Sequence, residues 1–438
     1  MDTPKDLLEE ATNRRSFMKG TGAAVGAGAI AAMAPNVHAQ GSDVIRVGLV
    51  GCGGRGTGAV TQILNHQHKG TKLVAVADAF MDKAEATVGR VAKAHKDKVD
   101  CPKDRIFAGF DAYKKVIASD VDLVVLATPP GWRPLHLQAA VDAGKHVFME
   151  KPVAVDGPGV RSVLESTAKA KEKNLLLQVG LQRRHEPRYM DTIKRLQDGA
   201  IGDILYMRAF WNGGGVWTRP RTADQNEMQY QMRNWYYFNW LCGDHIVEQH
   251  IHNLDVINWL KNDYPVEAQG MGGRQVRTDK EHGEIYDHHF IEFKYADGTR
   301  MYSQCRHIKN CYNSVSEHAY GTKGYSDINR SMIFGEDKWR FTGKNVSGHQ
   351  QEQLNLIDSL LAGERPNEGE YGAKSSMTSV LGRYASYSGK EITWGEAINT
   401  KVETAPGLAD YTFESEPPIK PDADGNYPIP MPGKTMVI

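Results

Sequence analysis

Residues 44–58, VIRVGLVGCGGRGTG, decide the fold of this 438-residue chain. The apolar run at residues 44–50 predicts a buried strand, and apolar residues resume at helical spacing from Ala59. Between them, Gly51-x-Gly53-x-x-Gly56 predicts a tight turn that opens a helix. The first glycine makes the turn, the second lets the backbone approach a pyrophosphate, and the third lets helix pack on strand. We therefore expect a dinucleotide here, with its phosphates at the helix N-terminus.

An acidic residue supports the dinucleotide prediction. Residues 72–77 form a second apolar run, and Asp78 ends it, about 20 positions after the last glycine, where dinucleotide-binding chains carry an acidic residue. A carboxylate there accepts hydrogen bonds from the ribose 2′-hydroxyl and repels a 2′-phosphate, which favours NAD over NADP. The alternative is a turn aspartate in a fold that binds no nucleotide.

Strand and helix patterns alternate over the next hundred residues. This alternation predicts an α/β fold, with a Rossmann domain over residues 40–185 built on a doubly wound parallel sheet. Predicted strands are 105–107, 122–127, 146–149 and 175–179, and predicted helices are 82–96, 113–118, 134–143 and 160–173.

Two of these strands end in conspicuous residues. Thr128-Pro129-Pro130 ends one strand at the edge of the sheet where ligands bind. Glu150-Lys151-Pro152 ends another. Lys151 is thereby placed to transfer a proton or to hold a substrate hydroxyl, and the alternative is a surface lysine before a turn.

Residues 1–39 have the pattern of an export signal. Arg14 and Arg15 lie in the run NRRSFMK at 13–19, an apolar stretch follows at 20–33, and VHA at 37–39 offers a cleavage site. This order predicts a twin-arginine (Tat) signal and a periplasmic protein. An ordinary N-terminal helix with two chance arginines is the alternative.

The composition excludes several classes of function. The 53 basic residues balance the 53 acidic ones, so there is no electrostatic reason to bind nucleic acid or anionic membrane. No apolar run is long enough for a membrane-spanning helix. Five cysteines without a CxxC pattern disfavour a disulfide framework or a zinc ribbon, although a bridge between Cys305 and Cys311 stays open.

The remaining residues, 186–438, are expected to form a second domain. Predicted strands are 204–211, 267–272, 289–295, 300–306 and 315–320. A helix at 350–361 is expected to pack across them, and the tail at 417–432, rich in Pro, Asp and Gly, is expected to lie extended on the surface.

The densest functional stretch is residues 235–259, WYYFNWLCGDHIVEQHIHNLDVINW. A helix from Asp244 would place Glu248, His252 and Asp255 on one face, as a set that handles protons. The predicted substrate contacts are Arg184, Trp235, Tyr236 and His245.

A metal site in this stretch is the less favoured alternative. His245, Glu248, His250 and His252 are all metal-ligand types. In a continuous helix, however, His250 points about 160° away from His252, so the two cannot share one ion. We therefore predict no metal here, and a purely structural histidine stays a further alternative.

These motifs together resemble the Gfo/Idh/MocA family of oxidoreductases. The resemblance rests on the loop at residues 51–56, on Asp78, on Thr128-Pro129-Pro130 with His136, and on Glu150-Lys151-Pro152. It implies a Rossmann domain followed by an α/β domain with a large, mainly antiparallel sheet that often joins subunits of a homo-oligomer, a dimer or tetramer. It also implies hydride transfer between NAD(P) and a sugar or polyol, with Lys151 near the reacting carbon. The residues it implies at the cofactor are Gly51, Cys52, Gly53, Gly54, Arg55, Gly56, Asp78, Thr128, Pro129, His136, Glu150 and Lys151.

The family's second motif, Asp-x-Gly-x-His-x-x-Asp, maps onto Glu248, His250, His252 and Asp255. The resemblance makes His252 the general base for a substrate hydroxyl. The chain departs from the motif where Glu248 replaces aspartate and His250 replaces glycine.

Export limits how such an enzyme can work. Outside the cytoplasm no pool of free NAD is expected, so the cofactor should be retained and recycled in place. One hypothesis is an oxidoreductase that oxidises one sugar and reduces a second substrate. Another is a glycosidase that oxidises, eliminates, hydrates and reduces; the NAD-dependent glycosidase branch of the family has a similar signal and loop, but its Tyr-Pro-Thr-His-Gly run is missing at 250–255. We favour the oxidoreductase, and a non-catalytic sugar or nucleotide sensor is the alternative of another class.

Overall fold

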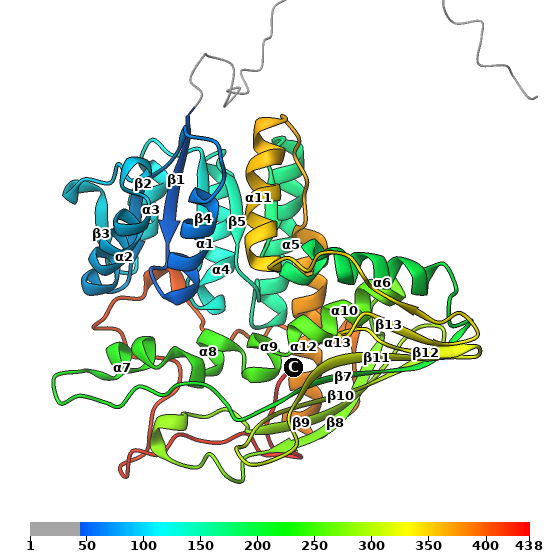
Figure 1. Cartoon of the computed structure of the whole chain (residues 1–438). Helices are drawn as coiled ribbons and strands as arrows, with labels where there is room; N and C mark the ends of the chain where they lie inside the picture. Colours follow the sequence, from blue (N-terminus) through cyan, green and yellow to red (C-terminus); the bar gives the residue numbers. More distant parts are fainter. Residues whose placement is uncertain (1–43) are drawn as a thin grey trace, which may run out of the picture. The chain divides into compact units, whose positions relative to one another are not determined.

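β1 (Ile45–Val50) lies inside a parallel sheet, as its apolar run predicts. The computed structural model describes residues 44–438 (Figure 1), and the predicted export signal at 1–39 lies outside them. Within the described residues the sheet has six strands in the order β3-β2-β1-β4-β5-β6, all paired in parallel. The other strands are β2 (Thr71–Asp78), β3 (Ile106–Ala108), β4 (Leu123–Leu126), β5 (His146–Met149) and β6 (Leu177–Val179). The strand order reverses between β1 and β4, so the crevice for a ligand opens at the carboxyl ends of these two strands.

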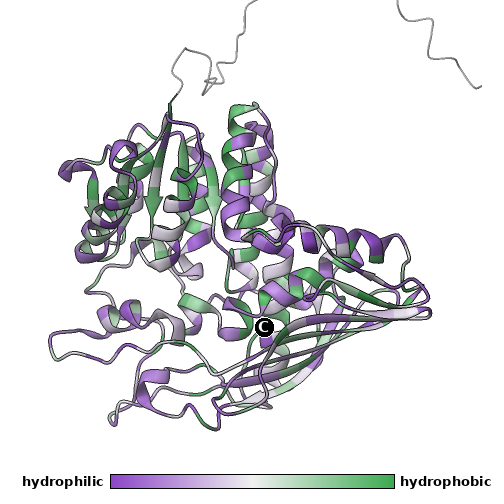
Figure 2. Cartoon of the chain, in the orientation of Figure 1, coloured by the Kyte–Doolittle hydropathy of each residue, from purple (hydrophilic) through white to green (hydrophobic). Residues whose placement is uncertain are grey.

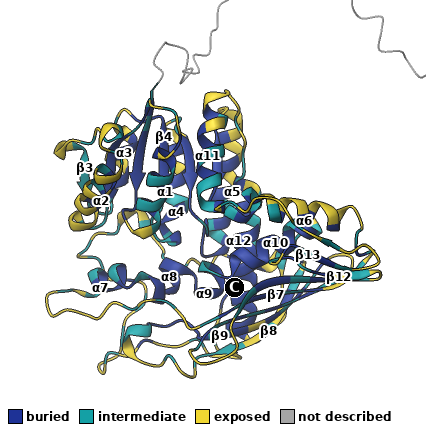
Figure 3. Ribbon diagram, in the orientation of Figure 1, coloured by how far each residue is buried: buried dark blue, intermediate teal, exposed yellow. Residues whose placement is uncertain are grey.

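Helices connect these strands and cover the sheet. They are α1 (Gly54–Leu64), α2 (Met81–Ala94), α3 (Ala112–Ala118), α4 (Arg133–Asp142) and α5 (Gly157–Glu172). Apolar residues gather along β1 and its neighbours (Figure 2), and the same strands are buried (Figure 3). The predicted Rossmann domain is confirmed.

The turn after β1 requires glycine at two positions. Gly51 has φ +99°, and a Cβ there would lie 2.5 Å from the backbone nitrogen of Thr128. A Cβ on Gly56 would lie 1.9 Å from the carbonyl oxygen of Gly51. The chain therefore packs α1 against β1 and β4 more closely than any side chain allows.

A second, larger sheet follows, and it is mainly antiparallel, as the resemblance implied. Its nine strands within residues 44–438 run in the order β14-β13-β12-β11-β7-β10-β9-β8-β15, and only β10 and β7 pair in parallel. They are β7 (Ile204–Gly213), β8 (Glu267–Gly273), β9 (His288–Lys294), β10 (Arg300–His307), β11 (Ser314–Gly321), β12 (Gly324–Asp327), β13 (Met332–Gly335), β14 (Trp339–Arg340) and β15 (Ile392–Thr393). The five predicted strands are present, whereas β12 to β15 were not predicted because each has four residues or fewer.

The helices of this half are α6 (Pro187–Gln197), α7 (Glu227–Arg233), α8 (Asn239–Cys242), α9 (His245–Glu248), α10 (Ile251–Lys261), α11 (Gly348–Leu361), α12 (Gly369–Ser388) and α13 (Trp394–Asn399). The prediction that α11 packs across the second sheet is wrong. Leu356, Ile357 and Leu360 enter the core that contains Ile45 and Ile63, so α11 lies beside α1 of the first sheet (Figure 1). An apolar helix face specifies that it will be buried, but not against which sheet.

The helix that does cover the second sheet is α12, which the sequence did not predict. It is buried over nearly all its length and contacts β8 and β9 (Figure 3). Its buried residues are mostly Ser, Ala and Gly, because the strands approach closely: a Cβ on Gly382 would lie 2.7 Å from the Phe293 ring. Small residues on every side leave no apolar stripe for a sequence pattern to detect.

The continuous helix predicted from Asp244 is also wrong. α9 ends at Glu248, and α10 begins at Ile251. The ring of His250, at the break, is buried and shares a 2.7 Å hydrogen bond with the hydroxyl of Ser303. Glu248 therefore does not belong to the helix face that carries His252 and Asp255.

The second half also contains the cysteine pair and the C-terminal tail. Among the described residues, Cys305 is a buried free thiol and Cys311 an exposed one, so the open question of a bridge is answered in the negative. Residues 417–432, predicted to lie extended on the surface, contain no helix or strand and are mostly exposed, although Pro417 and Tyr427 are buried. The Tyr427 ring is anchored against Phe238, with centroids 5.0 Å apart. No helix within residues 44–438 is both long and apolar enough to cross a membrane.

We predict that Gly56→Ala destabilises the protein by about 2 kcal/mol or more, because the new methyl group must displace backbone. Gly54→Ala is the matched control, since a Cβ there meets no described atom within 4 Å. The control should leave stability unchanged or raise it by about 0.5 kcal/mol, as Gly→Ala does in helices. Urea denaturation measures both, and equal stability of the two variants would contradict the close packing of α1.

Candidate active site

The glycine turn offers an open backbone cradle at the start of α1. Gly53 is the N-cap of this helix, and a Cβ added to Gly53 or Gly54 would meet no described atom within 4 Å. The first N–H groups of a helix attract anions. The turn therefore fits the pyrophosphate of the predicted NAD. Gly51 and Gly56 pack closely against backbone, whereas Gly53 and Gly54 leave free space for the ligand.

Asp78 lies at the end of β2, where the sequence placed it. Its carboxylate accepts hydrogen bonds from the backbone N–H groups of Cys52 (2.7 Å) and Phe80 (3.0 Å). Burial raises the pKa of Asp78. Because an ionised carboxylate has about four acceptor positions, capacity remains for ribose hydroxyls. The Cys52 thiol is buried against the carbonyl of Ala77, so Cys52 contributes its backbone rather than its side chain.

Arg55 joins the glycine turn to the end of β5. Its Nε and Nη2 atoms lie 2.9 and 2.7 Å from Oε1 of Glu150. Burial alone would raise the pKa of the Glu150 carboxyl, but the charges of Arg55 and Lys151 hold that pKa below its ordinary value. Glu352 of α11 lies 3.8 Å from Arg55 and was missed by the sequence analysis, since it lies outside the recognised motifs.

Thr128 and His136 are brought together behind the end of β4. The Thr128 hydroxyl lies 3.2 Å from Nδ1 of His136, whose ring packs at a tilt against Tyr113 with centroids 4.3 Å apart. Burial lowers the pKa of His136 to about 3, so its ring is neutral. His136 therefore supports Thr128 from the core side, and Pro129 begins the turn that leads into α4.

Lys151 binds α9 directly. Its Nζ donates to the backbone carbonyl of Glu248 at 2.6 Å and to the Glu248 carboxylate at 3.1 Å. Both side chains are largely buried, with 11% and 13% exposed. Burial raises the pKa of Glu248, and Lys151 opposes that shift. Lys151 thus holds a fixed positive charge at the carboxyl edge of the first sheet.

His252 is a neutral imidazole under the influence of that charge. Its ring packs against Trp211 with centroids 6.0 Å apart, and its Nδ1 has no hydrogen-bond partner among the described residues. Burial, followed by the charges of Lys151 and Arg183, lowers the pKa of His252 well below its ordinary value. A neutral histidine keeps a lone pair that can accept a proton.

Asp255 and Arg184, predicted for catalysis and for substrate, instead bind each other. The guanidinium donates from Nε at 2.9 Å and from Nη2 at 2.8 Å to the carboxylate. Ser375 of α12 donates to the same carboxylate at 2.7 Å. Three donors therefore bind the buried carboxylate of Asp255 and tie α10 to Arg184 and to α12.

Two of the predicted substrate residues, Tyr236 and His245, have different surroundings. Tyr236 packs against Trp235 and Trp217, with centroids 5.6 and 6.2 Å away, and Trp217 is 38% exposed. Burial and then the charge of Glu248 raise the pKa of the Tyr236 hydroxyl. His245, in contrast, is fully buried, and its ring stacks on His307 with centroids 4.3 Å apart.

A second buried ion pair escaped the sequence analysis. Arg183 pairs with Glu317 of β11, a fully buried carboxylate that also accepts from Asn253 and from Tyr189. A lone glutamate at an inward position of a strand carries no sequence signal of its own.

We predict that Asp255→Asn destabilises the protein by about 3–5 kcal/mol, because it leaves the mostly buried Arg184 unpaired. Ser375→Ala removes only one neutral donor to the same carboxylate and should cost about 1 kcal/mol. Chemical denaturation tests both variants. If Asp255→Asn kept wild-type stability and lost only reaction rate, Asp255 would be a proton-transfer group after all.

Comparisons with known proteins agree with this geometry. A family described as "Oxidoreductase family, NAD-binding Rossmann fold" matches residues 45–181, and the GFO/IDH/MocA C-terminal domain matches residues 189–326. Inositol 2-dehydrogenase from Klebsiella pneumoniae is 29% identical over 261 residues, which span 58% of this chain and 65% of that protein. A glycosyl hydrolase family 109 protein from Shewanella baltica is 26% identical over 217 residues, which span 45% of each.

Solved structures share the fold. Myo-inositol dehydrogenase from Lactobacillus casei, in complex with NAD(H) and myo-inositol, superposes with a TM-score of 0.60 at 19% identity, covering 83% of this chain and 99% of that one. An aldose–aldose oxidoreductase from Caulobacter crescentus superposes with a TM-score of 0.63 at 18% identity, covering 80% and 99%. With both domains matched in order, the chain belongs to the Gfo/Idh/MocA family of NAD-binding oxidoreductases.

Proposed function

We propose that this protein is an exported, NAD-dependent oxidoreductase that acts on a ring hydroxyl of a sugar or cyclic polyol and retains its cofactor. The observation that carries the proposal is a neutral imidazole, His252, whose pKa is lowered by burial and by the nearby ammonium of Lys151. A fixed cation and an uncharged base at the carboxyl edge of a NAD-binding sheet are the two groups that alcohol oxidation needs.

The roles of the chain's residues follow from their surroundings. The glycine turn and Asp78 would hold NAD, and the bound cofactor would accept a hydride from the sugar carbon. Lys151 donates a hydrogen bond to the oxygen of the reacting hydroxyl, and His252 accepts the proton that this oxygen loses. Glu248 keeps the ammonium in place through its carbonyl and carboxylate.

The substrate class rests on the relatives and on the aromatic cluster. Inositol, the substrate in the names of several relatives, is a ring of hydroxyl-bearing carbons. Trp217, Trp235 and Tyr236 offer aromatic faces beside Glu248, and such faces stack on the C–H surfaces of sugars.

Export and cofactor retention rest on the sequence alone. The twin-arginine run at residues 13–19 supports transport of a folded protein, which could carry NAD with it. A homo-oligomer is proposed on the outer face of the second sheet, where Leu205, Met271 and Phe290 are exposed.

A glycosidase is the second candidate function. It is favoured by the similarity to the glycosyl hydrolase family 109 protein. The same cation and base would serve the oxidation and reduction steps of that cycle, so the two candidates differ in what happens to the neighbouring C–H bond. The ordered Lys151 and the neutral His252 count against a mere sensor.

We predict that Lys151→Met and His252→Asn each lower kcat by about 10² to 10⁴ while NAD stays bound, because each removes one positioned proton-handling group. Lys145→Met is the matched control: Lys145 lies at the opposite end of β5 and donates to the Val121 carbonyl. It should retain near-wild-type turnover. Turnover of either site variant within about threefold of wild type would contradict its assigned role.

The pH profile gives an independent check on His252. A base must be unprotonated, and the pKa of this one is lowered. We expect kcat/KM to stay flat through pH values near 6.5, the ordinary histidine pKa, and to fall only in more acidic solution. A fall centred at the ordinary value would assign the base to another group.

Isotope labelling distinguishes the two candidate functions. An oxidoreductase should pass deuterium from the oxidised carbon of one sugar to the second substrate, with no glycosidic bond broken. A glycosidase cycle should instead place solvent deuterium at C2 of the released sugar in D₂O. We predict that label passes between the two substrates, and that the purified protein releases NAD only on denaturation. If the purified protein contained no nucleotide and bound none on titration, both candidates would be excluded.

A further inference from the structure

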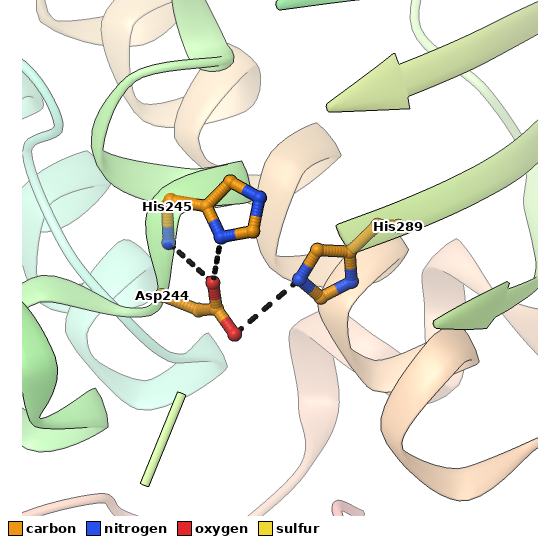
Figure 4. Close-up of side chains that lie close together, drawn as sticks. All are labelled: Asp244, His245 and His289. Atoms are coloured by element: carbon orange, nitrogen blue, oxygen red, sulfur yellow. Dashed lines mark hydrogen bonds and ion pairs between the residues drawn. The ribbon is translucent and has the colours of Figure 1, made fainter. Parts of the chain in front are cut away.

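A second cluster of chemically active side chains lies apart from the proposed reaction site. Asp244, which precedes α9, and His245, its first residue, meet His289 of β9 (Figure 4). Asp244 and His245 are 0% exposed and His289 is 3% exposed. Each residue offers one ligating atom, and the three atoms lie within 4.8 Å of one another.

Both imidazoles approach the same carboxylate without bonding well to it. Nδ1 of His245 lies 2.7 Å from Oδ1 of Asp244, and Nε2 of His289 lies 3.3 Å from Oδ2. Neither nitrogen makes a hydrogen bond of acceptable geometry to any described residue. Buried nitrogens without partners are costly, so the cluster lacks a group that would satisfy them.

The surrounding residues hold these three side chains in place. Nδ1 of His289 is hydrogen-bonded to the Ser386 hydroxyl at 2.9 Å, which turns Nε2 toward the carboxylate. Asp244 accepts from the backbone N–H of Tyr286 and from the Tyr387 hydroxyl. A hydrogen bond on the far nitrogen of a histidine is the usual support of a metal ligand.

We propose that Asp244, His245 and His289 bind one divalent transition-metal ion, with Zn²⁺ as the first candidate. Two imidazole nitrogens and one carboxylate oxygen are a common zinc donor set, and a water or the Tyr387 hydroxyl supplies the fourth ligand. The ion would bind Nδ1 of His245 and Nε2 of His289 and balance the buried charge of Asp244. Among the predicted substrate residues, only His245 is a proposed ligand, and its side chain is fully buried.

The place of the ion in the fold defines its role. It links the start of α9 to β9, and through Ser386 and Tyr387 to α12. Glu248, which binds Lys151, is the last residue of α9. The ion therefore anchors the short helix that orients Lys151, as a structural site without contact to substrate.

This site differs from the zinc alternative that the sequence suggested. That alternative used Glu248, His250 and His252 with His245. In the structure His250 is bonded to Ser303 and Glu248 to Lys151. His289 lies 44 positions beyond His245 along the chain, so no local spacing could reveal the pair.

Metal content is the direct test. The full chain, produced without a polyhistidine tag, is gel-filtered after brief exposure to a weak chelator and analysed by plasma mass spectrometry. We expect about one zinc ion per chain, and its loss in His289→Gln. His288→Gln is the matched control, since His288 is the preceding residue of β9, is half-exposed and pairs with Asp287 instead. Equal zinc in both variants would place the ion elsewhere and overturn the proposal.

A measurement on the wild-type chain covers the case in which His289→Gln does not fold. After metal removal, Co²⁺ should produce visible absorption bands of a four-coordinate site, and Zn²⁺ should raise the thermal midpoint by about 5 °C or more. A wild-type chain with less than about 0.1 ion and no change on adding Zn²⁺ or Co²⁺ would overturn the proposal. These readouts do not depend on the proposed oxidoreductase activity.

Discussion

The contact between the Lys151 ammonium and Glu248 is the interaction on which the site depends. It joins the carboxyl end of β5 in the first sheet to α9, which belongs to the second half of the chain. Because both side chains are largely removed from water, the pair is stable only while its geometry is kept. The position of the cation in the crevice is therefore fixed by the packing of both halves.

Two other ion pairs join separate parts of the chain around Lys151. Arg55 with Glu150 ties the glycine turn to the same strand end, and Arg184 with Asp255 ties the end of the first domain to α10. The Asp255 carboxylate, which a motif would assign to proton transfer, is thus bound by an arginine. His252 differs, since its ring packs against the Trp211 indole, and burial together with the charges of Lys151 and Arg183 keeps it neutral. The proposed base, His252, is thus uncharged, whereas the carboxylates that position the site are paired with cations.

How far the sequence predicts this structure depends on how local each signal is. The strand–turn–helix at Gly51–Gly56 and the strand-end residues Asp78 and Lys151 follow from short patterns, and all lie at the edge of the sheet where they were expected. The break between α9 and α10 was invisible, because it is stabilised by a side-chain contact to Ser303 from a distant strand. The partners of Asp255, and the His289 ring beside His245, were equally non-local.

The second half shows the same limit in its packing. Strands with alternating residues were found, since their pattern is local, whereas α12 has small residues on all sides and α11 joins a sheet nearly 300 positions earlier. A pattern of apolar residues indicates that a face will be buried. It does not indicate which partner covers it, because that choice is made by the path of the whole chain.

We propose that Lys151 and His252 flank the reacting carbon beside the nicotinamide. A crystal structure of the protein with NAD and a bound cyclic polyol tests it most directly. We expect the pyrophosphate to lie against Gly53 and the nicotinamide ring beside Lys151. One hydroxyl of the polyol should lie within about 3.2 Å of both Lys151 Nζ and a His252 ring nitrogen. A nicotinamide turned away from Lys151, or a substrate hydroxyl held by other side chains, would contradict it.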